Sequence, residues 1–218
     1  SSKQQTTSWR KALKGLVVCL GLVVVLLGGG SKAWGQYSVN FEGSGETNTA
    51  YAAATVSLSG INWSIGPSAL IGTSTSDWKN GARSLRLRAR NGSLASMTAN
   101  KANGIGTISF SYRRYATDGA QQPYAVEYST NNGSSWTQIG SNITATATVQ
   151  TFNQTVNVTG NIRIRFRLTT SPGTTGSRRL NIDDIQITDY APTPPIITSF
   201  TPNTVCASSN ATVTITGT

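Results

Sequence analysis

The chain contains no histidine and only two cysteines among its 218 residues, and charged residues make up only 12% of it. Without histidine, neither a Ser-His-Asp triad nor a Cys-His pair can form, and a zinc site built on imidazole ligands is excluded. After residue 35, no segment shows the repeat of an amphipathic helix. These absences exclude several classes of enzyme and favour a fold built from strands.

The first 35 residues have the features of a secretory signal peptide. A basic start precedes the apolar run GLVVCLGLVVVLL, and cleavage after Gly35 would leave the small residue Ala33 at position −3. A membrane anchor is the less favoured alternative, because spanning a bilayer takes roughly 20 apolar residues. We therefore predict a signal peptide at 1–35 and a secreted or cell-surface protein without a membrane span after cleavage.

Removal of this segment would lower the positive charge of the chain. The full sequence has 18 basic and 8 acidic residues and a formal net charge of +10. Five of the basic residues lie in the first 35 positions, which leaves a net charge of +5. A balance of this size can favour phosphate groups or anionic polysaccharides, but it is no nucleic-acid signature by itself.

Between residues 36 and 190, apolar and polar side chains alternate. In SLRLRAR (84–90) and NIRIRFRLT (161–169), apolar residues alternate with arginines. Successive side chains of a strand point to opposite faces, so each segment would bury an apolar row and expose an arginine row. Asn-Gly turns separate such segments. The pattern predicts an all-β domain at 36–190, a jelly-roll β-sandwich of about ten strands.

The end of the chain differs in composition. APTPP (191–195) predicts an extended Pro-rich linker. Residues 196–218 contain I-x-S-F-x-P and V-T-I-x-G, a pattern that resembles the opening strands of an immunoglobulin-like TIG (IPT/TIG) domain. Two strands cannot bury a sandwich core alone. We therefore expect either a truncated domain, with the disulfide partner of Cys206 in the missing part, or a disordered tail.

The stretch Ser129-x-Asn131-x-Gly133-x-x-Trp136 resembles the Asp-box hairpin of sialidases and related propellers. Here Asn131 stands where that family has an aspartate. The family's motif is a structural turn that lies away from the catalytic residues and recurs several times in a longer chain. A single copy is therefore interpreted as a well-formed turn, and not as a sign of sugar cleavage.

The arginine rows and several aromatic residues are candidates for ligand binding. If the two arginine segments occupied neighbouring strands, they would form one basic patch able to bind phosphates or acidic sugars. Alternatively, the arginines only keep the sheet faces soluble, paired with Glu127, Asp183 and Asp184. Aromatic candidates for a sugar platform are Trp63, Trp78, Trp136, Tyr112, Tyr115 and Tyr124, of which Trp63 is expected in the core and Trp78 at the surface. The predicted ligand-binding set is Trp78, Arg86, Arg88, Arg163 and Arg165.

Acidic residues occur near both ends of the predicted domain, in NFEGSGE (40–46) and RLNIDDIQITDY (179–190). The combination F-E…I-D-D-I resembles segments of MAM-type and carbohydrate-binding-module jelly rolls, where first and last strands often lie side by side. Calcium takes six to eight oxygen ligands, and the predicted calcium ligands are Glu42, Asp183 and Asp184. The alternative is a solvated strand end. The same acids could in principle serve a glycosidase, but nothing in the sequence separates their pKa values or builds a cleft.

Taken in order, GINWSIG, SDWKNGARSLRLR, GIGTISFSYRRY and RRLNIDDIQITDY resemble the accessory jelly-roll domains of exported bacterial proteins of the Bacteroidetes type. The resemblance spans about residues 36–190. It implies a non-catalytic adhesion, binding or spacer module of a multidomain protein, with polysaccharide or another extracellular glycan as the leading ligand. Two alternatives stay open: an accessory domain of a secreted nuclease that contacts DNA through its arginines, and a purely structural adhesin spacer.

Overall fold

The computed structural model describes residues 36–119, 121–170, 178–192, 196–201, 212 and 214–217. The described residues between 36 and 191 form one compact unit, and those from Pro192 onward belong to a second unit. The predicted signal peptide at 1–35, most of the Pro-rich linker and Cys206 lie outside the described residues, so the predictions made for them stay predictions.

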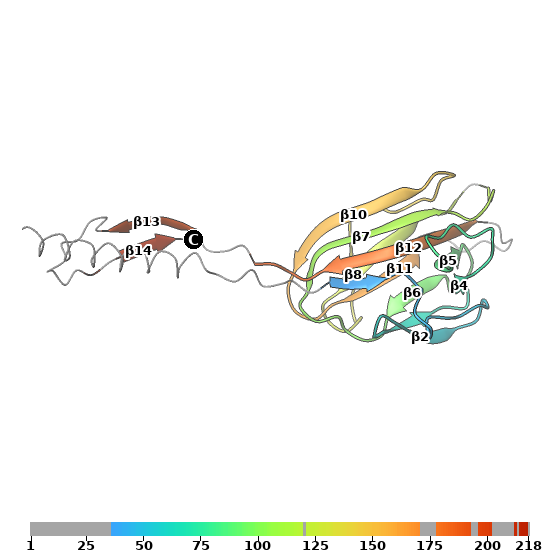
Figure 1. Ribbon diagram of the computed structural model, residues 1–218, viewed down its shortest axis with the longest axis horizontal. Coiled ribbons are helices and arrows are strands. Elements are labelled where there is room, and N and C mark those ends of the chain that lie inside the picture. Colours follow the sequence, from blue (N-terminus) through green and yellow to red (C-terminus); the bar gives the residue numbers. More distant parts are fainter. Residues whose placement is uncertain are drawn as a thin grey trace, which may run out of the picture. The chain divides into compact units, whose positions relative to one another are not determined.

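Two antiparallel sheets of six strands each form the main unit, and the described residues contain no helix (Figure 1). The first sheet has the order β10-β7-β12-β5-β4, and β1 pairs with β12. Its strands are β1 (Gln36–Val39), β4 (Ala69–Gly72), β5 (Ser84–Arg88), β7 (Ile105–Arg114), β10 (Gln150–Val158) and β12 (Arg179–Thr188). The all-β jelly-roll sandwich predicted from the sequence is confirmed.

The second sheet has the order β2-β3-β6-β11-β8-β9. Its strands are β2 (Ala54–Leu58), β3 (Ile61–Ile65), β6 (Leu94–Met97), β8 (Tyr124–Ser129), β9 (Thr137–Gln138) and β11 (Arg163–Leu168). No helix among the described residues is long and apolar enough to cross a membrane.

The alternation of the sequence determines which side chains fill the space between the sheets. On β5, Leu85 and Leu87 are buried, and on β11, Ile164 and Phe166 are buried. The arginines between these residues therefore lie on the outer faces of the two sheets, as the period of two requires.

Aromatic residues form the centre of the core. Trp63 stacks on Phe166 with ring centroids 6.1 Å apart, and Phe110 meets Phe166 edge to face at 5.2 Å. The indole N–H of Trp63 donates to the hydroxyl of Tyr37 (2.9 Å), and that hydroxyl donates to the carbonyl of Leu58 (2.8 Å). These bonds connect β1 of the first sheet with β3 and β2 of the second, and they satisfy polar atoms that burial would otherwise penalise.

In the second unit, β13 (Ile197–Thr201) pairs antiparallel with β14 (Thr214–Gly217). These strands fall within the two sequence patterns that resemble a TIG domain. Membership of that family stays a prediction.

Candidate ligand-binding surfaces

The two arginine rows lie on different sheets. Arg86 and Arg88 belong to β5 of the first sheet, whereas Arg163 and Arg165 belong to β11 of the second. Because both rows point away from the shared core, they occupy the outer faces of different layers. The expectation of one continuous basic patch made by both rows is therefore wrong.

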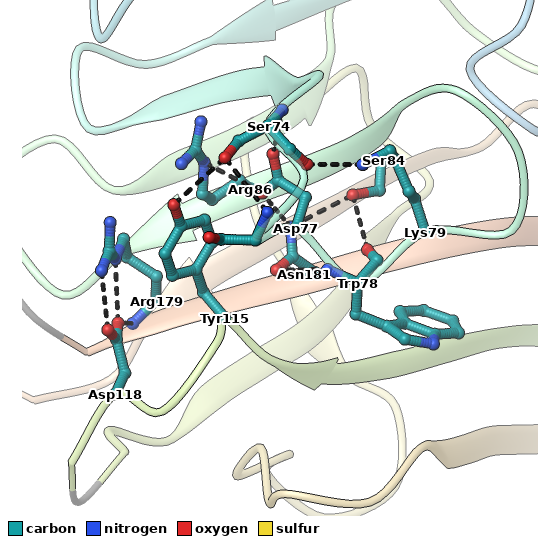
Figure 2. A network of polar contacts seen from close by, with 11 residues as sticks. Ser74, Asp77, Trp78, Lys79, Ser84, Arg86, Tyr115, Asp118, Arg179 and Asn181 are labelled. Atoms are coloured by element: carbon teal, nitrogen blue, oxygen red, sulfur yellow. Dashed lines mark hydrogen bonds and ion pairs between the residues drawn. The ribbon is translucent and has the colours of Figure 1, made fainter.

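On the first sheet, a loop between β4 and β5 covers part of the outer face (Figure 2). This loop brings the buried carboxylate of Asp77 to Arg86, whose Nε lies 3.2 Å from Oδ1. The buried amide of Asn181, on β12, donates to the same oxygen at 2.8 Å and to the Ser84 hydroxyl at 3.1 Å. Partners so far apart in the sequence fix the loop on the sheet, so this network is a structural one.

Beside this network, arginine and tyrosine side chains stack on one another. Arg88 lies 3.9 Å from the ring centre of Tyr51, and Arg179 lies 3.7 Å from that of Tyr115. Arg86 lies near both rings, at 5.6 and 4.9 Å. Contacts of this kind stabilise a cation over the face of an aromatic ring. The guanidinium groups thus cover part of the aromatic surface on this sheet.

Several of the aromatic residues predicted as candidates for a sugar platform are buried. Trp63 is inaccessible to solvent, as expected, but Tyr112 and Tyr124 are also buried, at 8% and 1% exposure. These two tyrosines therefore cannot form a sugar platform. Trp78 is half-buried, and its backbone N–H donates to Asn181 (3.3 Å) while the indole points away from Asp77 (Figure 2). Among the six aromatic candidates, Trp78, Tyr115 and Trp136 retain partial exposure.

On the second sheet, Glu127 is the centre of a charged group on the outer face. Its Oε2 accepts from the Nε of Arg165 (2.5 Å) and of Arg167 (3.0 Å), and its Oε1 accepts from Nη2 of Arg167 (2.8 Å). Burial would raise the pKa of Glu127, but the hydrogen bonds and charges of the two arginines outweigh it and lower this pKa below its usual value. Glu127 therefore holds both guanidinium groups in fixed orientations. The predicted pairing of arginines with Glu127 is confirmed, whereas the ion pairs of the described residues do not include Asp183 or Asp184.

Trp136 extends this group toward the sheet edge. The guanidinium of Arg165 lies 4.3 Å from the indole centre. The ring is placed by the turn between β8 and β9, where the indole N–H donates to the carbonyl of Gly133 at 3.0 Å. In the same turn the Asn131 carboxamide oxygen accepts from Ser135 N–H (2.9 Å), and Gly133 has a φ of 89°, a conformation that favours glycine. The prediction that this motif forms a turn is confirmed.

A hollow of about 260 Å³ lies next to Arg165 and Arg167. Its lining combines charged, polar and aliphatic groups from the turn before β6 and from the end of β11: Arg90, Asn91, Gly92, Ser93, Leu94, Arg165, Arg167, Leu168 and Thr170. Arg90 was interpreted in the sequence only as the end of the first arginine row. It lines the same hollow as Arg165 and Arg167 of the second sheet, because the chain crosses between the sheets at the Asn91-Gly92 turn. The Asn91-Gly92 turn can be seen in the sequence, and it was the signal from which this position of Arg90 could have been predicted.

The predicted calcium ligands gather around one stretch of the loop that precedes β5. Oδ2 of Asp183 accepts from the backbone N–H of Asn80 (2.8 Å), and Oδ2 of Asp184 accepts from the Asn80 side chain (2.9 Å). Glu42 Oε1 accepts from the backbone N–H groups of Ala82 and Arg83, at 2.9 and 3.0 Å. The three carboxylates thus approach the same loop.

Asp183 is fully buried at this position. A bulge follows it in the pairing of β12 with β7, and Asp184 has a φ of 53° there. Burial is the main cause that raises the pKa of Asp183 from its usual 3.8 to about 7. The N–H donors of Asn80 and Asp184 act in the opposite direction, and the negative charges of Asp184 and Glu42 add to the effect of burial. Protonation is therefore one way to neutralise this buried carboxylate.

A bound cation would be another way to neutralise it. However, the described residues contain no group of three or more His, Cys, Asp or Glu side chains placed to hold a metal ion. The carboxylates as they stand satisfy backbone and amide N–H donors and do not form a closed cage of ligands. Calcium binding by Glu42, Asp183 and Asp184 stays a prediction.

No protein-family model matches the sequence, and no curated protein matches it either. Among solved structures, the chain is similar to the CBM22-1 xylan-binding domain of Xyn10C from Paenibacillus barcinonensis, with 15% identity and a TM-score of 0.47 over 75% of this chain and 99% of that one. It is also similar to the K2 cleaved adhesin domain of Lys-gingipain, with 16% identity and a TM-score of 0.48 over 70% and 97% of the two chains. A family 29 carbohydrate-binding module aligns with 11% identity and a TM-score of 0.44 over 71% and 89%. At these similarities, function has to be inferred from the residues of this chain.

Proposed function

We propose that the sandwich is a non-catalytic glycan-binding module of an exported, multidomain protein. The observation that carries this proposal is the outer face of the second sheet. There a half-exposed tryptophan, two arginines held by a carboxylate, and a hollow lined in part by leucines lie next to one another. Small-molecule sites commonly combine apolar surface with a few well-placed polar groups.

The fixed orientation of the donors supports this role. Arg167 binds Glu127 through two parallel N–H···O bonds, a geometry that restrains the whole guanidinium plane. Arg165 is restrained by Glu127 on one side and by the Trp136 ring on the other. A ligand that binds here therefore meets donors that are already ordered, which reduces the entropy lost on binding.

The state of the carboxylates supports the non-catalytic part of the proposal. Four of them, Asp77, Asp118, Glu127 and Asp189, form ion pairs with Arg or Lys. The other four, Glu42, Glu46, Asp183 and Asp184, accept hydrogen bonds from backbone or amide groups. A glycosidase needs two carboxylates that face the scissile bond, and these residues are instead engaged with the protein.

Binding can be tested with a panel of purified polysaccharides by affinity gel electrophoresis. We expect at least one polysaccharide to retard the protein, and Trp136→Ala and Arg165→Ala to reduce the retardation. Trp78→Ala, in the loop between β4 and β5 of the first sheet, is the comparison variant for a tryptophan outside this surface. Retention of full binding in Trp136→Ala and Arg165→Ala would place the site elsewhere, and no binding to any polysaccharide would favour the structural-spacer alternative.

A further inference from the structure

The hollow on the second sheet carries more positive charge than the protein neutralises. Its lining includes Arg90, Arg165 and Arg167, and Glu127 forms ion pairs with the last two. All eight acidic residues of the chain lie in the part that the structure describes, and none of them forms an ion pair with Arg90. Of the three guanidinium groups, two are thus paired with one carboxylate and the third is not paired.

The Nε of Arg90 is buried and has no hydrogen-bond partner among the described residues, but the same holds for Arg83, Arg86, Arg88 and Arg114, so this atom does not by itself indicate a ligand. What distinguishes Arg90 is that its guanidinium lines the hollow without an ion pair. An anion bound in the hollow would supply the missing negative charge.

The size and lining of the hollow indicate the kind of anion. Leu94 and Leu168 contribute aliphatic surface, and Thr170 contributes a hydroxyl side chain beside the arginines. At about 260 Å³ the hollow is slightly smaller than the roughly 300 Å³ at which sites for drug-sized ligands begin. This combination suits one small charged unit with C–H groups and hydroxyls, as in a sugar that carries an acidic group.

From these features we propose that the hollow binds the carboxylate or sulfate group of an acidic sugar within a polysaccharide, with Arg90 and Arg167 as the anion ligands. The proposal rests on the proposed function and specifies its ligand class. Nε and Nη2 of Arg167 already donate to Glu127, so this arginine would contact the anion through its remaining N–H groups, while the guanidinium of Arg90 has no ion-pair partner among the described residues.

A nucleic acid fits the arrangement less well. Phosphate-backbone recognition uses a track of cations along the strand, and single-strand binders add several stacking aromatics. Here the arginine rows lie on different sheets, and Trp136 is the partly exposed tryptophan beside this group. The charge is therefore concentrated in one hollow and does not form a continuous track.

The test measures affinity of the full chain for three polysaccharides at low salt: polygalacturonate, which carries carboxylates, carrageenan, which carries sulfates, and a neutral galactan. We expect one or both acidic polymers to bind about tenfold or more tightly than galactan, with affinity falling as salt rises. Arg90→Ala should weaken acidic binding about tenfold and affect galactan binding much less. Arg90→Gln and melting temperatures check that the loss does not come from unfolding.

Arg113→Ala is the matched control, because Arg113 lies on β7 of the first sheet and its Nε donates to the backbone carbonyl of Ala147. It removes the same charge and should leave acidic binding within about twofold of the wild type. A preference for polygalacturonate would support the proposal with a carboxylate as the bound group, and a preference for carrageenan would support it with a sulfate.

Equal binding of galactan and the acidic polymers, unchanged in Arg90→Ala, would overturn this inference and leave the proposed function intact. Failure to bind any of the wider polysaccharide panel would overturn both. Duplex DNA included as a fourth probe would also overturn it, if DNA bound more tightly than the polysaccharides and Arg90→Ala abolished that binding.

Discussion

The stability of this protein should fall as the pH rises from about 5 to about 8, because Asp183 is buried. Its pKa is raised from the usual 3.8 to about 7. Between these two values the folded protein holds a proton that the unfolded chain has released, so stability decreases with increasing pH. The contribution is fully present below the unfolded pKa and is lost as the pH rises through the folded pKa.

The size of the effect follows from the same shift. A change from 3.8 to about 7 is roughly three pKa units, and each unit corresponds to 1.36 kcal/mol, so the full effect on the free energy of unfolding is about 4 kcal/mol. About two of these units lie above pH 5, so the free energy of unfolding should drop by about 3 kcal/mol between pH 5 and pH 8. The chain suits the measurement because it has no histidine, the side chain that ordinarily titrates in this interval.

Urea unfolding of the wild type and of Asp183→Asn at several pH values, with a calcium chelator present, measures the slope of the free energy of unfolding against pH. In Asp183→Asn one acceptor oxygen becomes a donor that faces a backbone N–H, which should cost about 1–3 kcal/mol at every pH. The slope itself should disappear. Asp184→Asn is the control, since it removes only a neighbouring negative charge and should keep the slope but move it to lower pH. An equal slope in the wild type and Asp183→Asn would refute the reasoning.

Three further predictions concern the core, the outer face and calcium. Phe166→Ala, which removes a fully buried ring that stacks on Trp63, should lower the free energy of unfolding by about 3–5 kcal/mol in urea titrations; a loss below about 1 kcal/mol would contradict the packing described. Glu127→Gln should cost about 1–3 kcal/mol, because two partly exposed arginines lose their counter-charge, and thermal melts that match the wild type would argue against the ion-pair group. If calcium binds as predicted, adding it at about pH 8 should raise the melting temperature of the wild type but not of Asp183→Asn, and a melting temperature indifferent to chelator would count against the site.

Local pattern was sufficient to predict the strands and their buried faces. The alternation around Leu85 and around Ile164 predicted two strands with outward arginines, and both are present. The turn at Ser129-x-Asn131-x-Gly133 was likewise predictable, because its hydrogen bonds join residues two to four positions apart. The segments before residue 73, which form β1 to β4, were less clear in the sequence, and β4 shows no alternation because all four of its residues are buried.

The candidate site was predictable only in part. The sequence identified Arg163 and Arg165, because they lie in a strongly alternating segment, and it offered Glu127 among the possible partners of the arginines. It did not identify Arg90 as a neighbour of Arg167, since the two meet across a turn that changes sheets. The burial of Tyr112 and Tyr124 was missed as well, because both faces of a strand can carry a tyrosine.

The sequence by itself determined the class of fold, the inward rows and the turn chemistry, since these depend on side chains a few residues apart. Only the tertiary structure decided which strands are neighbours, because the backbone hydrogen bonds that pair them are chemically the same for every strand. The pairing of the strands placed the two arginine rows on different sheets, and it brought Asn80 next to Asp183, which is 103 residues away in the sequence. The burial of Asp183 and the charge of the hollow follow from it.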